Sequence, residues 1–565
     1  MHTPKTSNSI RTSNSITRIR NLKKSSSLKK SNCFKRISNL KNSSSLKKSN
    51  FLKRISNFLI ITLISIFPLH PQSLRHTIGR LHLPDSIDVA RATTTNFTQA
   101  AAQVFGMNIG LWAFDRYIQK GPYAYISLNT IKANLKNGFE WDNDHLGTNM
   151  FAHPYNGSLF FNAARSNGYN FWCSSLFAIS GSAMWELFME REYPSTNDII
   201  ATPIGGAALG EVLYRASDLV IDNRRQGWGR LGRETAAFII SPMRGLTRII
   251  NGEAWRHQPT TGRQFGTPPI SVAISAGARI LAFHDDKELT KSGAAMRIDA
   301  EYGDRFAETS HSPYDYFTFL MELNAMKTQP LLSRIEIQGR LLSRAIVDTR
   351  PLNMSLGMWQ HFDYFDSDTI SRRNPLHPLD PCVVPYKLGI PASVGLGSML
   401  RYTGHPSWQI NAEAHLNAVI LGGILSDFYR VYHRNYNWAS GFAIKTALSW
   451  TEYRTRLSLS INNQFYNLYT WNGWEQNIKW SITPGGKPVN VQGDESSAIF
   501  NHLELRLNYP ILHRLFATLS LDWYHRNSSY KHWKAIETDG TNTIVINPKI
   551  ISDQIGLQFM LTYEI

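Results

Sequence analysis

Two glutamates in the middle of the chain have the spacing of a paired acidic site. Glu186 and Glu190 are four residues apart in a segment expected to be helical, so their carboxylates share a face and repel each other. A divalent metal ion would offset this repulsion, because carboxylates and imidazoles suit such ions. The candidate metal ligands are His153, Glu186, Glu190, Asp198 and Glu211. Arg165, Arg215 or a polar wall would offset the charge equally well, and the spacing matches no known metal motif.

A second candidate site is expected on a strand near residue 360. His361 and Asp363 alternate onto one face there, and with a serine such as Ser355 they resemble the parts of a lipid hydrolase. If this strand belongs to a β-barrel, the polar interior would contain such residues without any catalytic role. The sequence contains no Gly-x-Ser-x-Gly elbow and no Gly-x-x-x-x-Gly-Lys phosphate loop. We therefore favour a non-catalytic protein over an envelope enzyme, for which Glu186, Glu190, His361 and Asp363 are the catalytic candidates.

The second half of the chain has the pattern of a β-sheet with two unlike faces. From about residue 268 the apolar residues recur with a period of two. In the last segment Ile555, Phe559 and Leu561 fall on one face, and Gln554 and Gln558 fall on the other. We count about twelve such segments. They suit a closed membrane barrel with polar residues toward a lumen, whereas a soluble sandwich would bury the apolar faces against each other.

The net charge of the chain is concentrated in its first residues. Lys and Arg exceed Asp and Glu by 60 to 42, but residues 1–57 hold fifteen of the basic residues and no acidic one, which leaves 45 against 42. This distribution argues against a nucleic-acid partner, because the expected folded part is nearly neutral. Residues 1–57 contain an eighteen-residue Ser- and Lys-rich repeat and are predicted to be disordered. Residues 58–73 resemble a secretory signal, and a linker is expected over 74–103.

A helical domain is expected between the linker and the strands, over residues 104–258. The segments Phe171–Leu187 and Ile199–Ile221 are apolar and are separated by a turn. In the second segment Gly206 and Gly210 are four residues apart, which would let a neighbouring backbone approach closely. We expect this domain to plug the barrel or to cap its periplasmic mouth.

Several strings in the helical domain resemble a known family. They are His153–Gly157, Ala163–Gly168, Ser182–Glu186, Pro194–Asp198 and Gly205–Glu211. Together they resemble the uncharacterised domain family 3943 of bacterial envelope proteins, over about residues 104–255 and most specifically over 140–255. The element Trp359–Tyr364 is also similar. That family has no established activity, so the resemblance implies an architecture and not a mechanism.

The sequence as a whole predicts a mainly β protein with an α segment. An antiparallel transmembrane β-barrel of about 12 strands, over residues 268–565, follows the helical domain. We predict an outer-membrane location and a structural or transport-related role. The alternatives are a lipid- or envelope-modifying enzyme and a soluble periplasmic β-sandwich binding protein. Outer-membrane lipid and the barrel-assembly machinery are the expected partners. No cofactor is predicted apart from the candidate divalent metal. The sequence determines neither the oligomeric state nor whether Cys173 and Cys382 form a disulfide.

Overall fold

The computed structural model describes most of the chain after residue 93. The described residues are 94–283, 286–307, 309–310, 312–368, 384–473, 489–531, 536–538, 542–544 and 549–565. The predicted disordered tail and signal-like segment lie outside these ranges, and so does Cys382. Those two predictions, and the question of a bridge to Cys173, therefore stay open.

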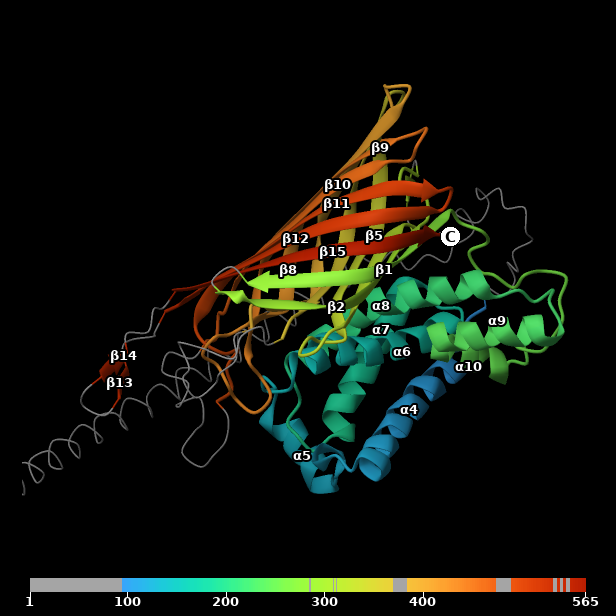
Figure 1. The fold of residues 1–565 in the computed structure, drawn as a ribbon. Helices are drawn as coiled ribbons and strands as arrows, with labels where there is room; N and C mark the ends of the chain where they lie inside the picture. Colours follow the sequence, from blue (N-terminus) through green and yellow to red (C-terminus); the bar gives the residue numbers. More distant parts are fainter. Residues whose placement is uncertain are drawn as a thin grey trace, which may run out of the picture. The chain divides into compact units, whose positions relative to one another are not determined.

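Twelve antiparallel strands close into a barrel (Figure 1). Their bounds are β1 Ile270–Phe283, β2 Asp286–Tyr302, β4 Phe317–Ala325, β5 Leu332–Thr349, β6 Leu352–Asp366, β7 Lys387–Tyr402, β8 Trp408–Leu425, β9 Tyr436–Glu452, β10 Ser458–Tyr469, β11 Ser496–Leu512, β12 Leu515–Tyr530 and β15 Lys549–Glu564. Each strand pairs with the next, and β15 pairs with β1, so the sheet closes without free edges. A short strand, β3 (Thr309–Ser310), pairs with β5, and β13 (Ile536–Thr538) pairs with β14 (Asn542–Ile544). The predicted barrel and its strand number are confirmed.

The two faces of the barrel wall differ as the alternation predicts. On β15, Gln554 and Gln558 point into the lumen and are 0% and 1% exposed, whereas Phe559 and Leu561 point outward and are 51% and 55% exposed. A soluble sandwich would bury the apolar face instead. The exposed apolar exterior therefore rules out the sandwich and is the arrangement of a barrel in lipid.

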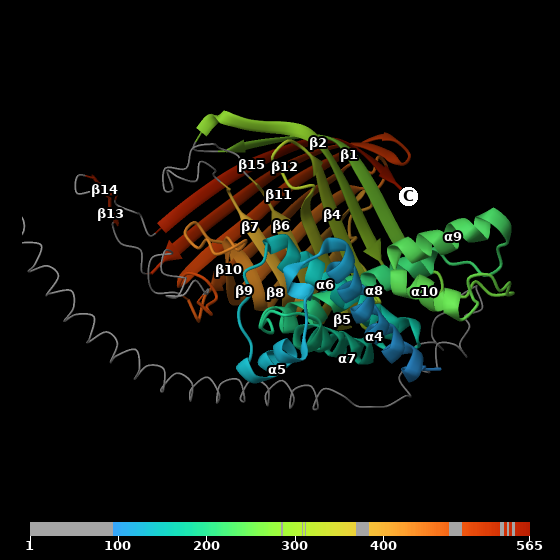
Figure 2. The same cartoon turned by 90° about the horizontal axis from the view of Figure 1, so that it is seen from below.

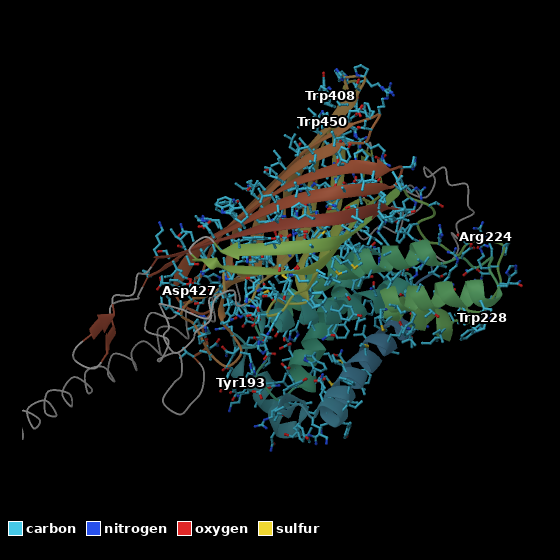
Figure 3. All side chains as sticks on the ribbon, viewed as in Figure 1. Tyr193, Arg224, Trp228, Trp408, Asp427 and Trp450 are labelled. Atoms are coloured by element: carbon cyan, nitrogen blue, oxygen red, sulfur yellow. The ribbon has the colours of Figure 1, made fainter. Side chains whose placement is uncertain are left out.

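The two ends of the barrel carry loops of different length. At the end that holds the C-terminus, β5 and β6 are joined by residues 350–351, and β11 and β12 by 513–514. At the other end the connections include 367–386 and 470–495. Short turns face the periplasm in bacterial barrels. Trp408 and Trp450 lie at the tip of β8 and β9 on the short-turn side (Figure 3), and tryptophan is common at membrane interfaces.

The segment before the barrel is helical. Its elements are α4 Phe97–Phe114, η1 Asp115–Gln119, η2 Pro122–Ala124, α5 Leu128–Asn137, η3 Thr148–Ala152, α6 His153–Ser166, α7 Phe171–Met184, η4 Trp185–Met189, α8 Asp198–Val220, α9 Gly227–Ile240 and α10 Pro242–Ile250. Because α4 begins at Phe97, the linker ends before the predicted residue 103. The first predicted helix corresponds to α7 with η4 and the second to α8. Among the described helices, none is both long and apolar enough to cross a membrane.

Glycines let α6 and α8 pack closely. A Cβ atom on Gly206 would lie 2.5 Å from the carbonyl carbon of Gly157, and one on Gly157 would lie 1.9 Å from the carbonyl oxygen of Thr202. No other residue fits at these two positions without moving a backbone. The close approach expected at Gly206 is confirmed, and it sets the spacing between the first residues of α6 and α8.

The helical domain packs against the outside of the barrel wall. Phe362 and Tyr364 point outward from β6, yet they are 0% and 3% exposed because they share one core with Met150 and Phe160 of the helical domain. Gln360 Nε2 also donates a hydrogen bond of 2.8 Å to a carbonyl of α8. In Figure 2 α6 and α8 lie across the wall of the barrel. The expected placement as a plug in the lumen or a cap over its mouth is therefore wrong, because outward-facing residues of the wall supply the contact.

Candidate functional site

Acidic residues from three parts of the helical domain meet at one place. The group comprises Asp142, Asp144, His153, Glu186, Glu190 and Asp198, and we call it the acid–histidine cluster. Ligand atoms of Asp142, Asp144 and His153 lie within 4.8 Å of one another. His153 Nε2 is 3.9 Å from Asp198 Oδ1, and the carboxyl group of Asp198 lies beside that of Asp142. The carboxyl group of Glu186 likewise lies beside that of Glu190. Four of the five predicted metal ligands therefore belong to this cluster.

Three element ends bring these side chains together. His153 is the first residue of α6, Asp198 is the first residue of α8, and Glu186 lies in η4 at the end of α7. Ser195 and Asn197 hold the turn before α8, since Ser195 N donates 2.6 Å to Glu186 Oε2 and Asn197 Nδ2 donates 2.9 Å to Asp198 Oδ1. The convergence follows from the close packing of α6 on α8.

Sequence analysis missed Asp142 and Asp144, which lie in the loop between α5 and η3. Asp142 N donates 3.1 Å to Asn197 Oδ1, and Asn149 Nδ2 donates 2.5 Å to Asp142 Oδ1. The only sequence feature that could have pointed to these two residues is the run Asp142-Asn143-Asp144, which lies within the segment that resembles the family. It carries no helical or strand periodicity, so the pattern of the chain did not connect it to Glu186.

The same loop fastens the cluster to the barrel. Arg434, between β8 and β9, donates 2.8 Å to the carbonyl of Asp142, and Tyr436 OH donates 3.2 Å to the carbonyl of Asp144. The rings of His145 and His433 stack with centroids 4.5 Å apart. The cluster thus lies at the seam between the helical domain and the long-loop end of the barrel.

Burial and mutual proximity disfavour the charged form of the carboxyl groups in the cluster. Glu186 and Asp198 are 1% and 2% exposed. Burial, and then the neighbouring carboxylates, raise the pKa of Glu186, Glu190 and Asp198 well above their ordinary values. Burial and Asp142 raise the pKa of Asp144 to about 6. The charged groups that act most on the pKa of Glu186, Glu190 and Asp198 are carboxylates, with no lysine or arginine among them.

Glu211, the fifth predicted metal ligand, lies elsewhere and is already neutralised. Its Oε2 is 2.7 Å from Nε of Arg165 and its Oε1 is 2.8 Å from Nε of Arg215. Burial raises the pKa of Glu211, but the two guanidinium groups outweigh it and the net shift is downward. The arginines that were the alternative to a metal therefore compensate Glu211, and the cluster around Glu186 is left without them.

His361 and Asp363 both face the lumen but do not form a catalytic pair. Asp363 Oδ1 is 2.5 Å from Nζ of Lys445, and the ring of His361 packs against that of His415 with centroids 5.0 Å apart. Ser355 lies on the same strand six residues away, a distance of about 20 Å along an extended chain. The arrangement of a lipid hydrolase is therefore not assembled from these residues.

Paired charges and aromatic rings occupy much of the lumen. Glu504 of β11 reaches across to Arg297 of β2 and Arg334 of β5, at 2.5 and 3.2 Å. A cavity of about 290 Å³ remains beside these charges. Toward the long-loop end the lumen holds a cluster that includes Phe365, Tyr386, Tyr466, Phe500 and Tyr524. In the described part of the chain the lumen is thus crossed by side chains, which disfavours a wide pore.

Comparison with family models agrees with the resemblance drawn from the sequence. The family described as "Domain of unknown function (DUF3943)" matches residues 138–243. The resemblance is confirmed. This segment contains every member of the acid–histidine cluster as well as Glu211. A comparison with curated proteins gave no match.

Solved structures with some likeness to the chain include several outer-membrane barrels. The NanC porin is 10% identical and has a TM-score of 0.21, with 51% of this chain and 98% of that one covered. The toluene transporter TbuX of Ralstonia pickettii is 10% identical at a TM-score of 0.20, covering 52% and 89%. OmpT of Vibrio cholerae is 8% identical at 0.19, covering 52% and 99%. These values are too low to carry an argument, and the geometry of the barrel carries it instead. A closed antiparallel barrel with an apolar exterior and a polar interior is an outer-membrane protein.

Proposed function

We propose that this outer-membrane protein binds a divalent metal ion at the acid–histidine cluster. The observation that carries the proposal is a set of buried carboxylates whose main electrostatic neighbours are other carboxylates. A bound cation would remove the repulsion that burial and proximity create. Asp142, Asp144 and His153 are the nearest ligand set, with Asp198 beside them.

The ligand types favour a transition ion over calcium. Imidazole suits Zn²⁺ and related ions, whereas Ca²⁺ and Mg²⁺ prefer all-oxygen sites. Burial lowers the pKa of the His153 imidazole, which keeps the ring in the neutral form that coordinates metals. We therefore expect Zn²⁺ to bind more tightly than Mn²⁺, Ca²⁺ or Mg²⁺.

A bound ion at this position would fasten the helical domain to the barrel. The Asp142 loop receives a hydrogen bond from Arg434 and another from Tyr436, and both residues belong to the barrel. Without a cation, repulsion within the cluster would push this loop away from Asp198. The structural role that we propose is therefore a metal-dependent attachment of the helical domain to the barrel. We prefer it to a wide transport pore because side chains cross the lumen.

An envelope enzyme is the second candidate, and the exposure of one ligand favours it. Asp144 is exposed whereas Glu186 is buried, so an ion held here would face solvent on one side. A metal-bound water at such an open position becomes a nucleophile at neutral pH. The substrate would then be a lipid or another envelope component, as the sequence alternative has it.

Metal binding by the full chain in detergent micelles tests the proposal. Isothermal titration with Zn²⁺, Mn²⁺, Ca²⁺ and Mg²⁺ is compared for the natural protein, for Asp142→Asn with Asp144→Asn, and for the matched control Asp348→Asn. Asp348 is an exposed carboxylate of β5, far along the chain from the cluster. We expect binding in the natural protein and the control and a loss of at least tenfold in the double variant. Equal binding in all three proteins, or none in any, would overturn the proposal.

A further inference from the structure

Two helices of the helical domain contain no charged side chain. The eighteen residues of α4 and the fourteen residues of α7 include no Asp, Glu, Lys or Arg. The two helices lie side by side, with the rings of Phe97 and Phe177 5.9 Å apart. A helix that is apolar all round belongs either in a protein core or in a membrane, because water favours a charged outer face.

The outer side of these helices is not in a core. The exposed large apolar side chains of α4, η1 and α7 are Phe97, Phe105, Ile109, Phe114, Tyr117, Ile118, Leu176 and Ile179, and we call them the apolar helix face. Phe97 is 66% exposed and Phe105 is 53% exposed. Soluble proteins scatter single apolar residues over their surface, but many exposed large apolar residues on neighbouring helices mark an interaction site.

The apolar helix face belongs to a domain that already replaces lipid on part of the barrel. Phe362 and Tyr364 on β6 are covered by this domain, whereas Leu356 and Met358 further along the same face of the strand are 46% and 37% exposed. The covered and the exposed residues share one outward-facing row. The domain therefore lies directly beside the part of the wall that contacts lipid.

We propose that the apolar helix face lies against the acyl chains of the outer membrane. The helical domain is then a partly embedded companion of the barrel and not a periplasmic appendage. In this arrangement α4 and α7 lie in one leaflet beside the barrel, with their apolar side toward the acyl chains. This inference is independent of the metal ion, because it involves neither the acid–histidine cluster nor its ligands.

Spin labels in vesicles distinguish a lipid contact from the alternatives. In a background with the three cysteines replaced by serine, a nitroxide is attached at Phe105→Cys or Ile179→Cys, and the full chain is placed in phosphatidylethanolamine–phosphatidylglycerol vesicles. Leu561→Cys on the outside of β15 is the lipid reference. Lys136→Cys on α5, an exposed charged position, is the water reference. All four positions are exposed, so labels there disturb packing little.

Power saturation with oxygen and with a nickel chelate gives the readout. We expect the labels at positions 105 and 179 to match the Leu561 label, with high access to oxygen and low access to the chelate. A chelate response like that of the Lys136 label would place the face in water and overturn the proposal. Low access to both reagents would also overturn it, because a protein partner or a second copy would then cover the face. The measurement is repeated with a metal chelator. The same access to oxygen and to the nickel chelate is expected, because the lipid contact does not depend on a bound metal ion.

Discussion

Removing one carboxylate from the acid–histidine cluster separates a metal site from a merely crowded acidic group. Asp198→Asn keeps the size of a side chain that touches both Asp142 and His153 but removes its charge. If an ion occupies the cluster, the natural protein gains stability from the added metal and the variant does not. If no ion binds, the variant is the more stable protein at neutral pH because one source of repulsion has gone.

The size of the effect follows from mass action. A ligand that binds only the folded state at 100 times its dissociation constant contributes about 2.7 kcal/mol. For a unit of roughly 150 to 250 residues, about 1 kcal/mol shifts the unfolding midpoint by about 2–4 °C. We therefore expect a metal-induced shift of about 5–11 °C in the helical domain of the natural protein and almost none in Asp198→Asn.

The pH dependence of stability gives the same experiment a second readout. The folded pKa of Glu186, Glu190 and Asp198 lies above the unfolded value, so the folded state binds more protons and metal-free stability falls as the pH rises. For Asp144 this loss falls between its ordinary value of 3.8 and about 6. Metal binding needs the deprotonated ligands, so with metal present the stability rises over the same range.

The assay is the loss of helical circular dichroism on heating in detergent, at pH 5 and pH 8, with chelator or with Zn²⁺. Migration of unheated samples on a gel checks that the barrel itself stays folded in both proteins. The reasoning would be refuted by an equal metal-induced shift in the natural protein and in Asp198→Asn. It would also be refuted by metal-free stability that increases from pH 5 to pH 8.

Three further predictions concern packing and buried charge. Glu211→Gln leaves two buried guanidinium groups without their carboxylate and should lower the free energy of unfolding by about 3–5 kcal/mol, measured by denaturant titration. Gly206→Ala should force α6 away from α8, cost about 1–3 kcal/mol and weaken metal binding, whereas the control Gly229→Ala has open space and should do neither. Asp363→Asn should destabilise the barrel through the unpaired Lys445 yet leave metal titrations unchanged, and a weakened metal response would contradict the separation of the two sites.

The strands and helices themselves could be predicted because their signals are local. Alternating side chains such as Ile555 and Gln554 record the two-residue period of a strand within a few positions. The apolar stretches that become α7 and α8 are likewise continuous in the sequence and are separated by a turn. Glu186 and Glu190 do lie together, but not as two residues of one helical turn, because η4 ends at Met189 and Glu190 is its extended C-terminal cap.

Tertiary structure alone decided where those elements meet. Alternation fits both a membrane barrel and a soluble sandwich, and only closure of the barrel left Phe559 exposed on the outside and Gln558 buried in the lumen. The placement of the helical domain on the outer wall was mispredicted because it depends on contacts between residues far apart in the chain, such as Ile204 and Gln360, which are 156 positions apart. Glu211 and Asp142 show the same limit, since each has its partners set by packing of α6, α8 and a loop. The period of a strand or helix depends on neighbouring residues, so it can be recognised in the sequence. The partners of a buried charge depend on how distant segments pack together, so they cannot.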